Sequence, residues 1–379
     1  MFEGKKLICP ISGSTKFSKI FTIRKFPIYM GVLNKSKKFE FKKLSFNINK
    51  SSGSVQIHPK VPLRKLYFKP HGSGTVGMTW KNHHSSFFKF LSKDFKNLVI
   101  EIGGGHNSVS ESIGLSGFKK NYKLISFDPN GKKYANPNHF IVKDFFSKKY
   151  VKKYKDRVSL VIHSHLFEHI YDPNNFLIDI NNSLKIGGLH IFSVPNLKFM
   201  IKNGYSNAMN FEHPYFLEES MIDYLLKKNG FKILKKKKYL NHSIFYKTKK
   251  TTNNPKKINV YRKFEVNKRL FKNYYKNLKK DVNLINKKIK TYQNVFLFGA
   301  HIFSQMLIFN GLNISLIKNI LDNDKKKHNQ YLYGTKIKVV SPKNLRNVDK
   351  PIIILRAAQY SNEIKKDILK NINKKTRFI

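Results

Sequence analysis

The sequence predicts an α/β fold with more than one domain, and three observations support this prediction. The chain has 379 residues, which is more than one compact core usually serves. Short apolar runs read as buried parallel strands, and segments with helical signals follow them. The run at 98–102 ends directly in a glycine turn, and the run at 122–127 ends directly in an aspartate. We therefore expect strand–turn–helix units that bind a ligand at their turns.

The net charge of +52 is the most unusual feature of the composition. Only eight of the 74 basic residues are arginines, and the lysines are spread over every segment together with many asparagines. Nucleic-acid-binding proteins usually gather their charge on one face and use arginine for bidentate contacts. We therefore expect solvated surface lysines rather than a nucleic-acid partner, and a phosphorylated anionic substrate would also suit this charge.

The cysteine content and the hydropathy pattern indicate a cytoplasmic protein. Cys9 is the single cysteine, which excludes an internal disulfide and fits a reducing compartment. The first residues lack the apolar core of a signal peptide, and no run approaches the roughly 18 apolar residues of a membrane span. We expect no membrane span, and the sequence does not indicate an oligomeric state.

The stretch "NLVIEIGGG" predicts a strand at 98–102 that ends in three glycines, Gly103, Gly104 and Gly105. Asn107 and the serines after it are suited to cap a following helix. Such a turn offers backbone N–H groups and a surface without side chains to a ligand. A dinucleotide site would have G-x-G-x-x-G, whereas this chain has an acid before the glycines, Glu101, in the pattern E-x-G-x-G. Asp128 ends the next strand, where a carboxylate can accept hydrogen bonds from ribose.

The segment from Val158 to Pro195 continues the same pattern. It predicts a strand at 158–162, followed by a polar segment at 163–165 where the chain leaves the sheet. Asp172 and Pro173 begin a helix, and Gly187-Gly188 end it. A second strand follows these glycines. With these motifs in order, residues 97–195 resemble the class I S-adenosylmethionine-dependent methyltransferases, which have a Rossmann-like core.

The resemblance assigns roles to seven residues. It implies that Glu101 and the three glycines, Gly103, Gly104 and Gly105, line the methionine end of S-adenosylmethionine and that Asp128 binds the ribose. It places Asp144 near the adenine, although Asp144 could instead be a helix N-cap. It places His165 at the boundary between cofactor and substrate.

The flanking segments resemble those of the sugar C-methyltransferases. This resemblance divides the chain into a degraded zinc-binding-type module (1–80), the methyltransferase core (81–250), a linker with a connecting helix (251–290) and a Rossmann-like C-terminal domain (291–379). The family opens with C-x-x-C, whereas this chain has Cys9-x-x-Ser12 and no second C-x-x-C. Four histidines, His58, His71, His83 and His84, lack paired ligand spacing. We therefore expect no zinc and a module that folds by its apolar contacts alone.

The segment Asn210-Phe211-Glu212-His213 resembles the family's Y-H-E-H motif. The family implies that Glu212 and His213 remove the proton next to a keto group, because a carboxylate orients an imidazole and raises its basicity. His169 matches another active-site histidine, with a role in stabilising the enolate oxygen. An alternative is that Glu212 and His213 cap a helix near Pro214. Family tyrosines are absent at Asn210 and in the stretch "FKPHGSGTVG".

The expected activity is therefore S-adenosylmethionine-dependent C-methylation of a nucleotide-linked keto-deoxysugar, for surface glycan or secondary-metabolite synthesis. An O- or N-methyltransferase acting on a glycan or its precursor is the alternative, and the absent tyrosines favour it. A nucleic-acid methyltransferase and a non-catalytic scaffold are weaker alternatives. The C-terminal domain would form a wall for the substrate, and Lys325 and Lys326 would either contact its nucleotide or be ordinary exposed lysines.

Overall fold

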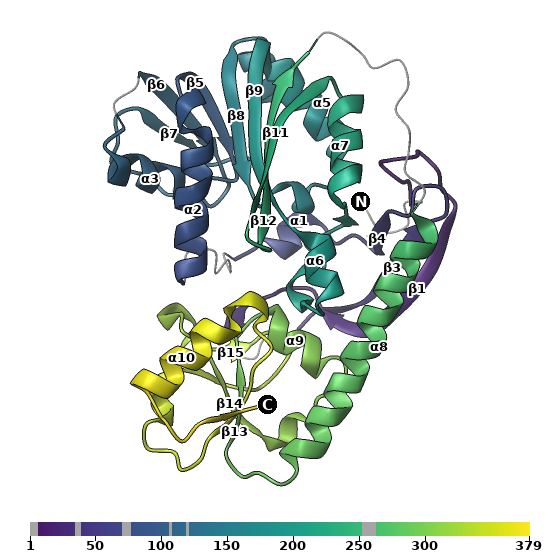
Figure 1. Cartoon of the computed structure of the whole chain (residues 1–379), viewed down its shortest axis with the longest axis vertical. Coiled ribbons are helices and arrows are strands. Elements are labelled where there is room, and N and C mark those ends of the chain that lie inside the picture. Colours follow the sequence, from purple (N-terminus) through teal and green to yellow (C-terminus); the bar gives the residue numbers. More distant parts are fainter. Residues whose placement is uncertain (1–6, 35–38, 70–76, 106–107, 119–120, 252–262) are drawn as a thin grey trace.

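The computed structural model describes residues 7–34, 39–69, 77–105, 108–118, 121–251 and 263–379. It contains two α/β units, one above the other in Figure 1, with an antiparallel sheet and a long helix beside them. The capping role expected for Asn107 and the linker expected after residue 251 fall on residues 106–107 and 252–262, outside the described part. None of the helices in the described part is long and apolar enough to cross a membrane.

The upper unit is a seven-stranded sheet with the order β11-β12-β9-β8-β5-β6-β7. Neighbouring strands from β9 to β7 pair in parallel, whereas β12 and β11 join as an antiparallel edge. Strand β5 pairs with both β6 and β8, so the strand order reverses beside it, and ligands bind at such a switch point in open α/β sheets. The strands are β5 (Asn97–Ile102), β6 (Tyr122–Phe127), β7 (His139–Val142), β8 (Val158–Ser164), β9 (Leu184–Pro195), β11 (Phe231–Tyr239) and β12 (Ser243–Lys250).

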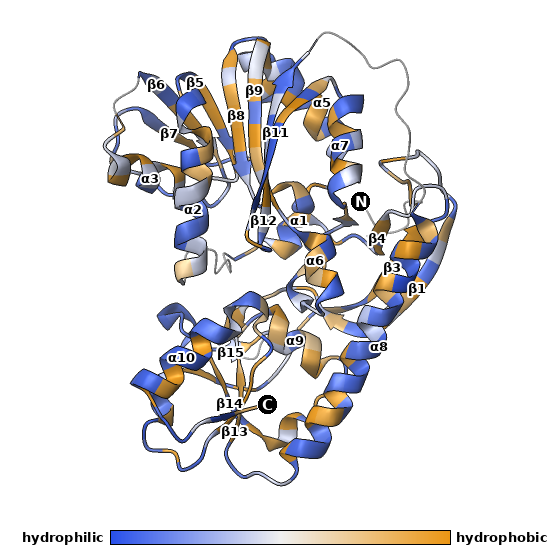
Figure 2. Cartoon of the chain, viewed as in Figure 1, coloured by the Kyte–Doolittle hydropathy of each residue, from blue (hydrophilic) through white to orange (hydrophobic). Residues whose placement is uncertain are grey.

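Helices cover both faces of this sheet because side chains alternate along its strands. Val99 of β5 packs with helices α2 (Met78–Leu91) and α3 (Ser108–Ser116) on one face. Its neighbour Ile100 packs on the opposite face, where α5 (Pro173–Ser183) and α7 (Glu219–Lys228) contribute apolar side chains, with Tyr150 of α4 (Lys148–Tyr154). Figure 2 shows the result, with apolar colour along β8 and β9 and a largely polar edge strand β11.

Two local expectations in this unit are wrong. Helix α5 ends at Ser183, and Gly187-Gly188 lie inside β9 rather than at the end of the helix. Gly187 has a φ of +74°, and the pairing of β8 with β9 shifts register between Val158 and Leu160, so these glycines accommodate an irregular strand start. His163 belongs to β8 and is fully buried, so it does not lie in a polar segment where the chain leaves the sheet.

The N-terminal residues share sheets with the rest of the chain. Strands β1 (Phe17–Pro27), β3 (Phe41–Asn49) and β4 (Val55–His58) form an antiparallel sheet whose fourth strand is β10 (Tyr215–Phe216). Strand β2 (Val32–Leu33) pairs with β15 (Tyr331–Leu332) of the lower unit. Short helices α1 (Leu63–Leu66) and α6 (Leu197–Lys202) pack into the same apolar cluster.

A polar cluster joins the segment before β1 to the turn between β3 and β4. Cys9 Sγ lies 3.2 Å from Ser52 Oγ, and Ser12 donates a hydrogen bond of 3.0 Å to Asn49 Oδ1. Asn49 Oδ1 also accepts from the N–H and the hydroxyl of Ser52 at 3.0 and 3.2 Å. The motifs Cys9-x-x-Ser12 and Asn49-x-x-Ser52 thus converge, and the expectation that apolar contacts alone hold this module is wrong.

The lower unit is a parallel sheet with the order β16-β14-β13-β17-β18. Helix α8 (Phe264–Ile289) runs from the N-terminal sheet to this unit, and Arg356 fastens it through Asp281 with two hydrogen bonds of 2.6 and 2.7 Å. Lys325 and Lys326 are exposed. The remaining elements are β13 (Val295–Phe298), α9 (Ile302–Ile308), β14 (Ile317–Leu321), β16 (Val339–Val340), β17 (Ile352–Ile354), α10 (Ser361–Asn371) and β18 (Arg377–Phe378).

Candidate functional site

Glu101 is a buried carboxyl at the carboxyl end of β5. It is 5% exposed, and it accepts a hydrogen bond of 2.6 Å from Ser126, its pairing partner on β6. Ser126 also lies 2.8 Å from Nε2 of His139 on β7, whose Nδ1 meets Ser110 at 2.5 Å. Burial raises the pKa of Glu101 to about 7, and the nearby charge of Asp128 acts in the same direction. The hydrogen bond from Ser126 lowers this pKa but does not outweigh burial. This carboxyl is therefore held rigidly and gains from a cationic partner.

The glycine turn brings Glu101 and Asp128 close to the backbone. A Cβ on Gly104 would lie 2.3 Å from Glu101 Oε2, and a Cβ on Gly105 would lie 2.6 Å from Asp128 Oδ2. Gly103 has a φ of +79°, which disfavours any residue with a side chain. The turn therefore needs glycine for close approach and for its backbone conformation.

Asp128 follows β6 and binds the same turn. Its Oδ2 accepts from the N–H of Gly105 at 2.9 Å, and its Oδ1 accepts from the N–H of Asn130 at 2.7 Å. Each oxygen keeps a further lone pair for a ligand hydroxyl. These features fit S-adenosylmethionine. The buried acid Glu101 suits its amino-acid end, the oriented acid Asp128 suits its ribose, and the glycine turn between them leaves room for it.

Asp144 follows β7 and is exposed. It accepts from the N–H of Phe145 at 2.8 Å and from the hydroxyl of Tyr150 at 2.9 Å. Helix α4 begins at Lys148 with Ser147 as its N-cap residue, so the alternative of Asp144 as that helix's N-cap is wrong.

His165 lies just beyond β8 with a left-handed φ of +49°. Its Nε2 lies 2.8 Å from Ser243 Oγ, and its Nδ1 lies 3.5 Å from Glu168. It thus stands at the same edge of the sheet as Glu101 and Asp128.

Glu212, His169 and His213 gather in a second cluster. His169 Nδ1 lies 3.7 Å from Glu212 Oε2, and the rings of His169 and His213 lie 4.7 Å apart. Glu212 is 4% exposed. Both Glu212 and His213 lie between a 3-10 turn at 206–208 and β10, so the alternative that they cap a helix near Pro214 is wrong.

The backbone around His213 sets the form of its ring. His213 Nδ1 lies 3.0 Å from the carbonyl oxygen of Ala208, which can only accept, so Nδ1 carries the proton in the neutral ring and Nε2 is the free base. Burial and the neighbouring His169 lower the pKa of His213 to about 4, although Glu168 and Glu212 act in the opposite direction. His213 is therefore neutral near pH 7 with an unprotonated Nε2, and the lowered pKa makes it a weaker base than a free imidazole.

Tyr67 belongs to this cluster and was not expected from the sequence. Its hydroxyl lies 2.9 Å from Nδ1 of His169, and burial and the charge of Glu212 raise its pKa well above 10.0, so the phenol stays protonated. The family tyrosines are absent from the stretch "FKPHGSGTVG", and Tyr67 lies directly before that stretch. This position is the only sequence signal that could have pointed to it.

Glu168 joins the two halves of the site. It is buried behind His165, and one of its oxygens lies within 4.8 Å of a ring nitrogen of His169 and of His213. Burial acts to raise the pKa of Glu168, but the hydrogen bond from His165 and the nearby His169 and His213 lower it to about 2. A fixed negative charge therefore lies between the cofactor side and the histidine cluster.

Two family models match the chain. A model described as "Methyltransferase domain" matches residues 83–236, and one described as "C-methyltransferase C-terminal domain" matches residues 241–379. No curated protein matches the chain.

Solved structures of S-adenosylmethionine-dependent methyltransferases are similar to part of the chain. One from Mesorhizobium loti has 10% identity and a TM-score of 0.35 over 44% of this chain and 96% of its own. One from Archaeoglobus fulgidus has 15% identity and a TM-score of 0.35 over 45% and 94%. One from Aquifex aeolicus has 14% identity and a TM-score of 0.35 over 44% and 89%. The two family models carry the identification: the chain is a class I S-adenosylmethionine-dependent methyltransferase that resembles the C-methyltransferases.

Proposed function

We propose that this enzyme methylates a carbon atom next to the keto group of a nucleotide-linked keto-deoxysugar. The observation that carries the proposal is the cluster of His213, Glu212, His169 and Tyr67, which combines a neutral base with protonated donors. Glu212 is buried and the other three residues are partly buried. The match of residues 241–379 to the C-terminal domain of C-methyltransferases supports it.

The cofactor residues proposed here are those of the glycine turn and its neighbours. S-adenosylmethionine supplies the methyl group when bound. Glu101 would bind its amino group, Asp128 its ribose and Asp144 its adenine side, while the backbone of Gly103, Gly104 and Gly105 leaves room for it. His165 would stand between the cofactor and the acceptor.

His213 would act as the general base. Its Nε2 would take the proton from the carbon next to the keto group, leaving the electron pair as an enolate that bonds to the incoming methyl group. Glu212 would stabilise the charge that develops on the histidines as the proton arrives. The neutral state of His213 suits this step, because an imidazolium could not accept the proton.

His169 would hold the enolate oxygen, and Tyr67 would position His169. The protonated phenol of Tyr67 can donate to Nδ1 of His169, and in that tautomer Nε2 of His169 carries a proton that it can donate to the oxygen. Donors aimed at a developing oxyanion are among the largest contributions to catalysis. This geometry also replaces the tyrosines that are absent from the neighbouring stretch.

Methylation of a hydroxyl or amino group on a glycan precursor is the second candidate. It needs the base, His213, but forms no enolate and gives the donor His169 no oxyanion to bind. Removal of the proton from the carbon next to the keto group therefore distinguishes C-methylation from O- or N-methylation.

The test uses the purified protein in heavy water with S-adenosylmethionine and a panel of nucleotide-linked keto-deoxysugars. We expect deuterium at the carbon next to the keto group and a new carbon–methyl bond, measured by mass spectrometry and NMR. His213→Gln should lose both while it still binds S-adenosylmethionine, and Asp128→Ala should lose cofactor binding in calorimetry. A methyl group found on oxygen or nitrogen without deuterium uptake would establish the second candidate instead.

A further inference from the structure

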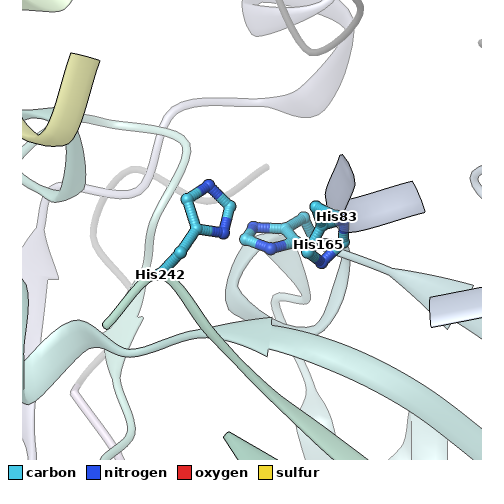
Figure 3. A group of neighbouring side chains, drawn as sticks. All are labelled: His83, His165 and His242. Atoms are coloured by element: carbon cyan, nitrogen blue, oxygen red, sulfur yellow. The ribbon is translucent and has the colours of Figure 1, made fainter. Parts of the chain in front are cut away.

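Three histidines from distant parts of the chain meet beside the cofactor side of the site. His83 lies on α2, His165 follows β8, and His242 lies in the turn between β11 and β12. Figure 3 shows the three rings side by side, and one nitrogen from each lies within 4.8 Å of the other two. We propose that His83, His165 and His242 form a binding site for a divalent transition-metal ion of the Zn²⁺ type, here called the three-histidine site.

The spacing of the rings matches that of a metal centre. The ring centroids of His83, His165 and His242 are separated by 5.1, 5.3 and 5.3 Å, so they form a nearly equilateral triangle. A tetrahedral zinc with bonds of about 2.0–2.1 Å to three imidazole nitrogens places the ring centroids about 5.2 Å apart. The spacing of the rings is therefore compatible with bonds from all three to one metal ion.

A hydroxyl already stands where two of the ring nitrogens converge. Ser243 Oγ lies 2.8 Å from Nε2 of His165 and 2.5 Å from Nδ1 of His242. A serine hydroxyl has one proton, so it can donate to only one of these nitrogens. Rotation of the Ser243 side chain away from this point would leave both nitrogens to a cation.

His83 adds a buried ring to the group. Its side chain is fully buried, and its Nδ1 has no hydrogen-bond partner among the residues that the structure describes, although its Nε2 lies 3.1 Å from Ser193 Oγ. A buried polar atom without a partner is costly, and binding a ligand would satisfy it.

Burial and an aromatic ring shield the group. His83 and His242 are buried. Trp80 packs against the group, with its ring 4.9 Å from that of His165 and 4.8 Å from that of His242. A cation at this point would therefore lie among imidazole donors rather than in bulk water.

Glu168 supplies the negative charge that a buried cation needs. Its Oε1 lies 3.5 Å from Nδ1 of His165, so it can hold the Nδ1 proton and leave Nε2 to face the metal. Metal-binding histidines are usually oriented in this way by a carboxylate or carbonyl. His242 has a comparable neighbour, since Tyr360 of the C-terminal domain lies 3.3 Å from its Nε2.

The donor set indicates the class of metal and an open coordination position. Imidazole suits Zn²⁺, Co²⁺, Ni²⁺ and Cu²⁺, whereas Mg²⁺ and Ca²⁺ prefer oxygen ligands. Three histidines leave the fourth position of a tetrahedral metal to water or another oxygen. From the sequence we expected no zinc, with His83 among the four histidines considered, so this proposal departs from that expectation. Positions 83, 165 and 242 have no spacing from which the three-histidine site could be read.

The test measures metal binding without S-adenosylmethionine or substrate, so that it is independent of the proposed function. The purified full chain is stripped with a chelator, and Zn²⁺ or Co²⁺ is added. Elemental analysis after dialysis should give one metal ion per chain. Co²⁺ should give the visible absorption of a tetrahedral site.

Variants separate this site from chance binding by other histidines. His165→Asn and His242→Asn should each weaken Co²⁺ binding by at least about 100-fold, and Glu168→Gln by about 10–100-fold. Ser243→Ala should retain the metal, since it removes only the competing hydroxyl. His84→Asn, next to His83 but outside the group, is the matched control and should bind as the wild type does. Wild-type protein that is folded by circular dichroism but binds neither metal, or binding that survives in both asparagine variants, would overturn the proposal.

Discussion

The hydroxyl of Tyr67 lies 2.9 Å from Nδ1 of His169, across 102 positions of sequence. The contact joins the N-terminal module to the loop after β8, so the acid–base cluster is complete only when both are folded together. We expect Tyr67→Phe to lower deuterium uptake by a keto-deoxysugar substrate about 100-fold, a usual size for an acid–base group, with an unchanged dissociation constant for S-adenosylmethionine.

Tyr275→Phe is the matched control for this change, because Tyr275 of α8 packs on Phe21 away from the site. It should retain full exchange. A Tyr67→Phe enzyme as fast as the wild type would show that Tyr67 does not position His169 for catalysis.

The raised pKa of Glu101 predicts how cofactor binding depends on pH. Its pKa is about 7 in the protein without ligand, and a cationic amino group would be bound by the carboxylate form only. Affinity for S-adenosylmethionine should therefore weaken as the pH falls through 7, to about tenfold below its plateau at about pH 6. Calorimetry over this range checks the slope, and Glu101→Gln should bind weakly with a flat profile. A wild-type affinity that does not change with pH would show that this carboxyl does not hold the amino group.

The same carboxyl affects stability in the opposite direction. The folded state holds the Glu101 proton more tightly than the unfolded chain does, since its pKa is raised from 4.5. Stability contributed by this group is therefore present at low pH and is lost as the pH rises through about 7. Thermal unfolding of Glu101→Gln, which cannot ionise, should lack this loss, so that its advantage over the wild type grows from about pH 5 to about pH 8.

The glycine turn offers a test of space rather than charge. Gly104→Ala would place a methyl group 2.3 Å from Glu101 Oε2, so the carboxyl must move and the affinity for S-adenosylmethionine should fall more than about tenfold. Gly114→Ala, within α3, is the control. Among the described residues its Cβ would meet only Tyr134, at 3.4 Å, and it should stabilise the helix by up to about 1 kcal/mol. Calorimetry and thermal unfolding measure the two effects. Equal affinities for both variants would argue against the glycine cradle as the cofactor site.

Asn49 should be a major stabilising residue of the N-terminal module. It is fully buried and accepts hydrogen bonds from Ser12 and Ser52, so Asn49→Ala should lower the free energy of unfolding by about 1–3 kcal/mol. Asn47→Ala removes a single partly buried hydrogen bond of 3.3 Å and should cost less. Urea denaturation of both variants measures the difference, and similar midpoints would show that the cluster contributes little.

The features that could be predicted from the sequence are those formed by neighbouring residues. Glu101 and the three glycines after it form one strand and one turn, so their spacing alone indicates a close-approach site. Asp172 and Pro173 likewise begin α5, and Asp172 accepts the N–H of Asn175 as an N-cap. Such signals depend on local backbone geometry, which a short stretch of sequence determines.

The features that could not be predicted depend on long-range packing. Tyr67, His83 and His242 reach the site from three different segments, and none of them has a local motif. Glycine gave a wrong signal at Gly187, because the same residue type serves a helix end and an irregular strand. His163 was likewise predicted to lie where the chain leaves the sheet, because it is polar. The sheet instead buries its ring, whose centre lies 4.8 Å from that of Phe192 and 5.0 Å from that of His190.

The sheet shared by β4 and β10 has a consequence for the order in which the protein is made. Strand β4 leaves the ribosome at residues 55–58, but its neighbour β10 follows only at residues 215–216. Domains usually fold as they emerge. Here the first segment keeps an unpaired strand edge until most of the methyltransferase core has been translated. A nascent chain arrested before residue 215 should therefore carry an N-terminal segment that proteases and chaperones still recognise as unfinished.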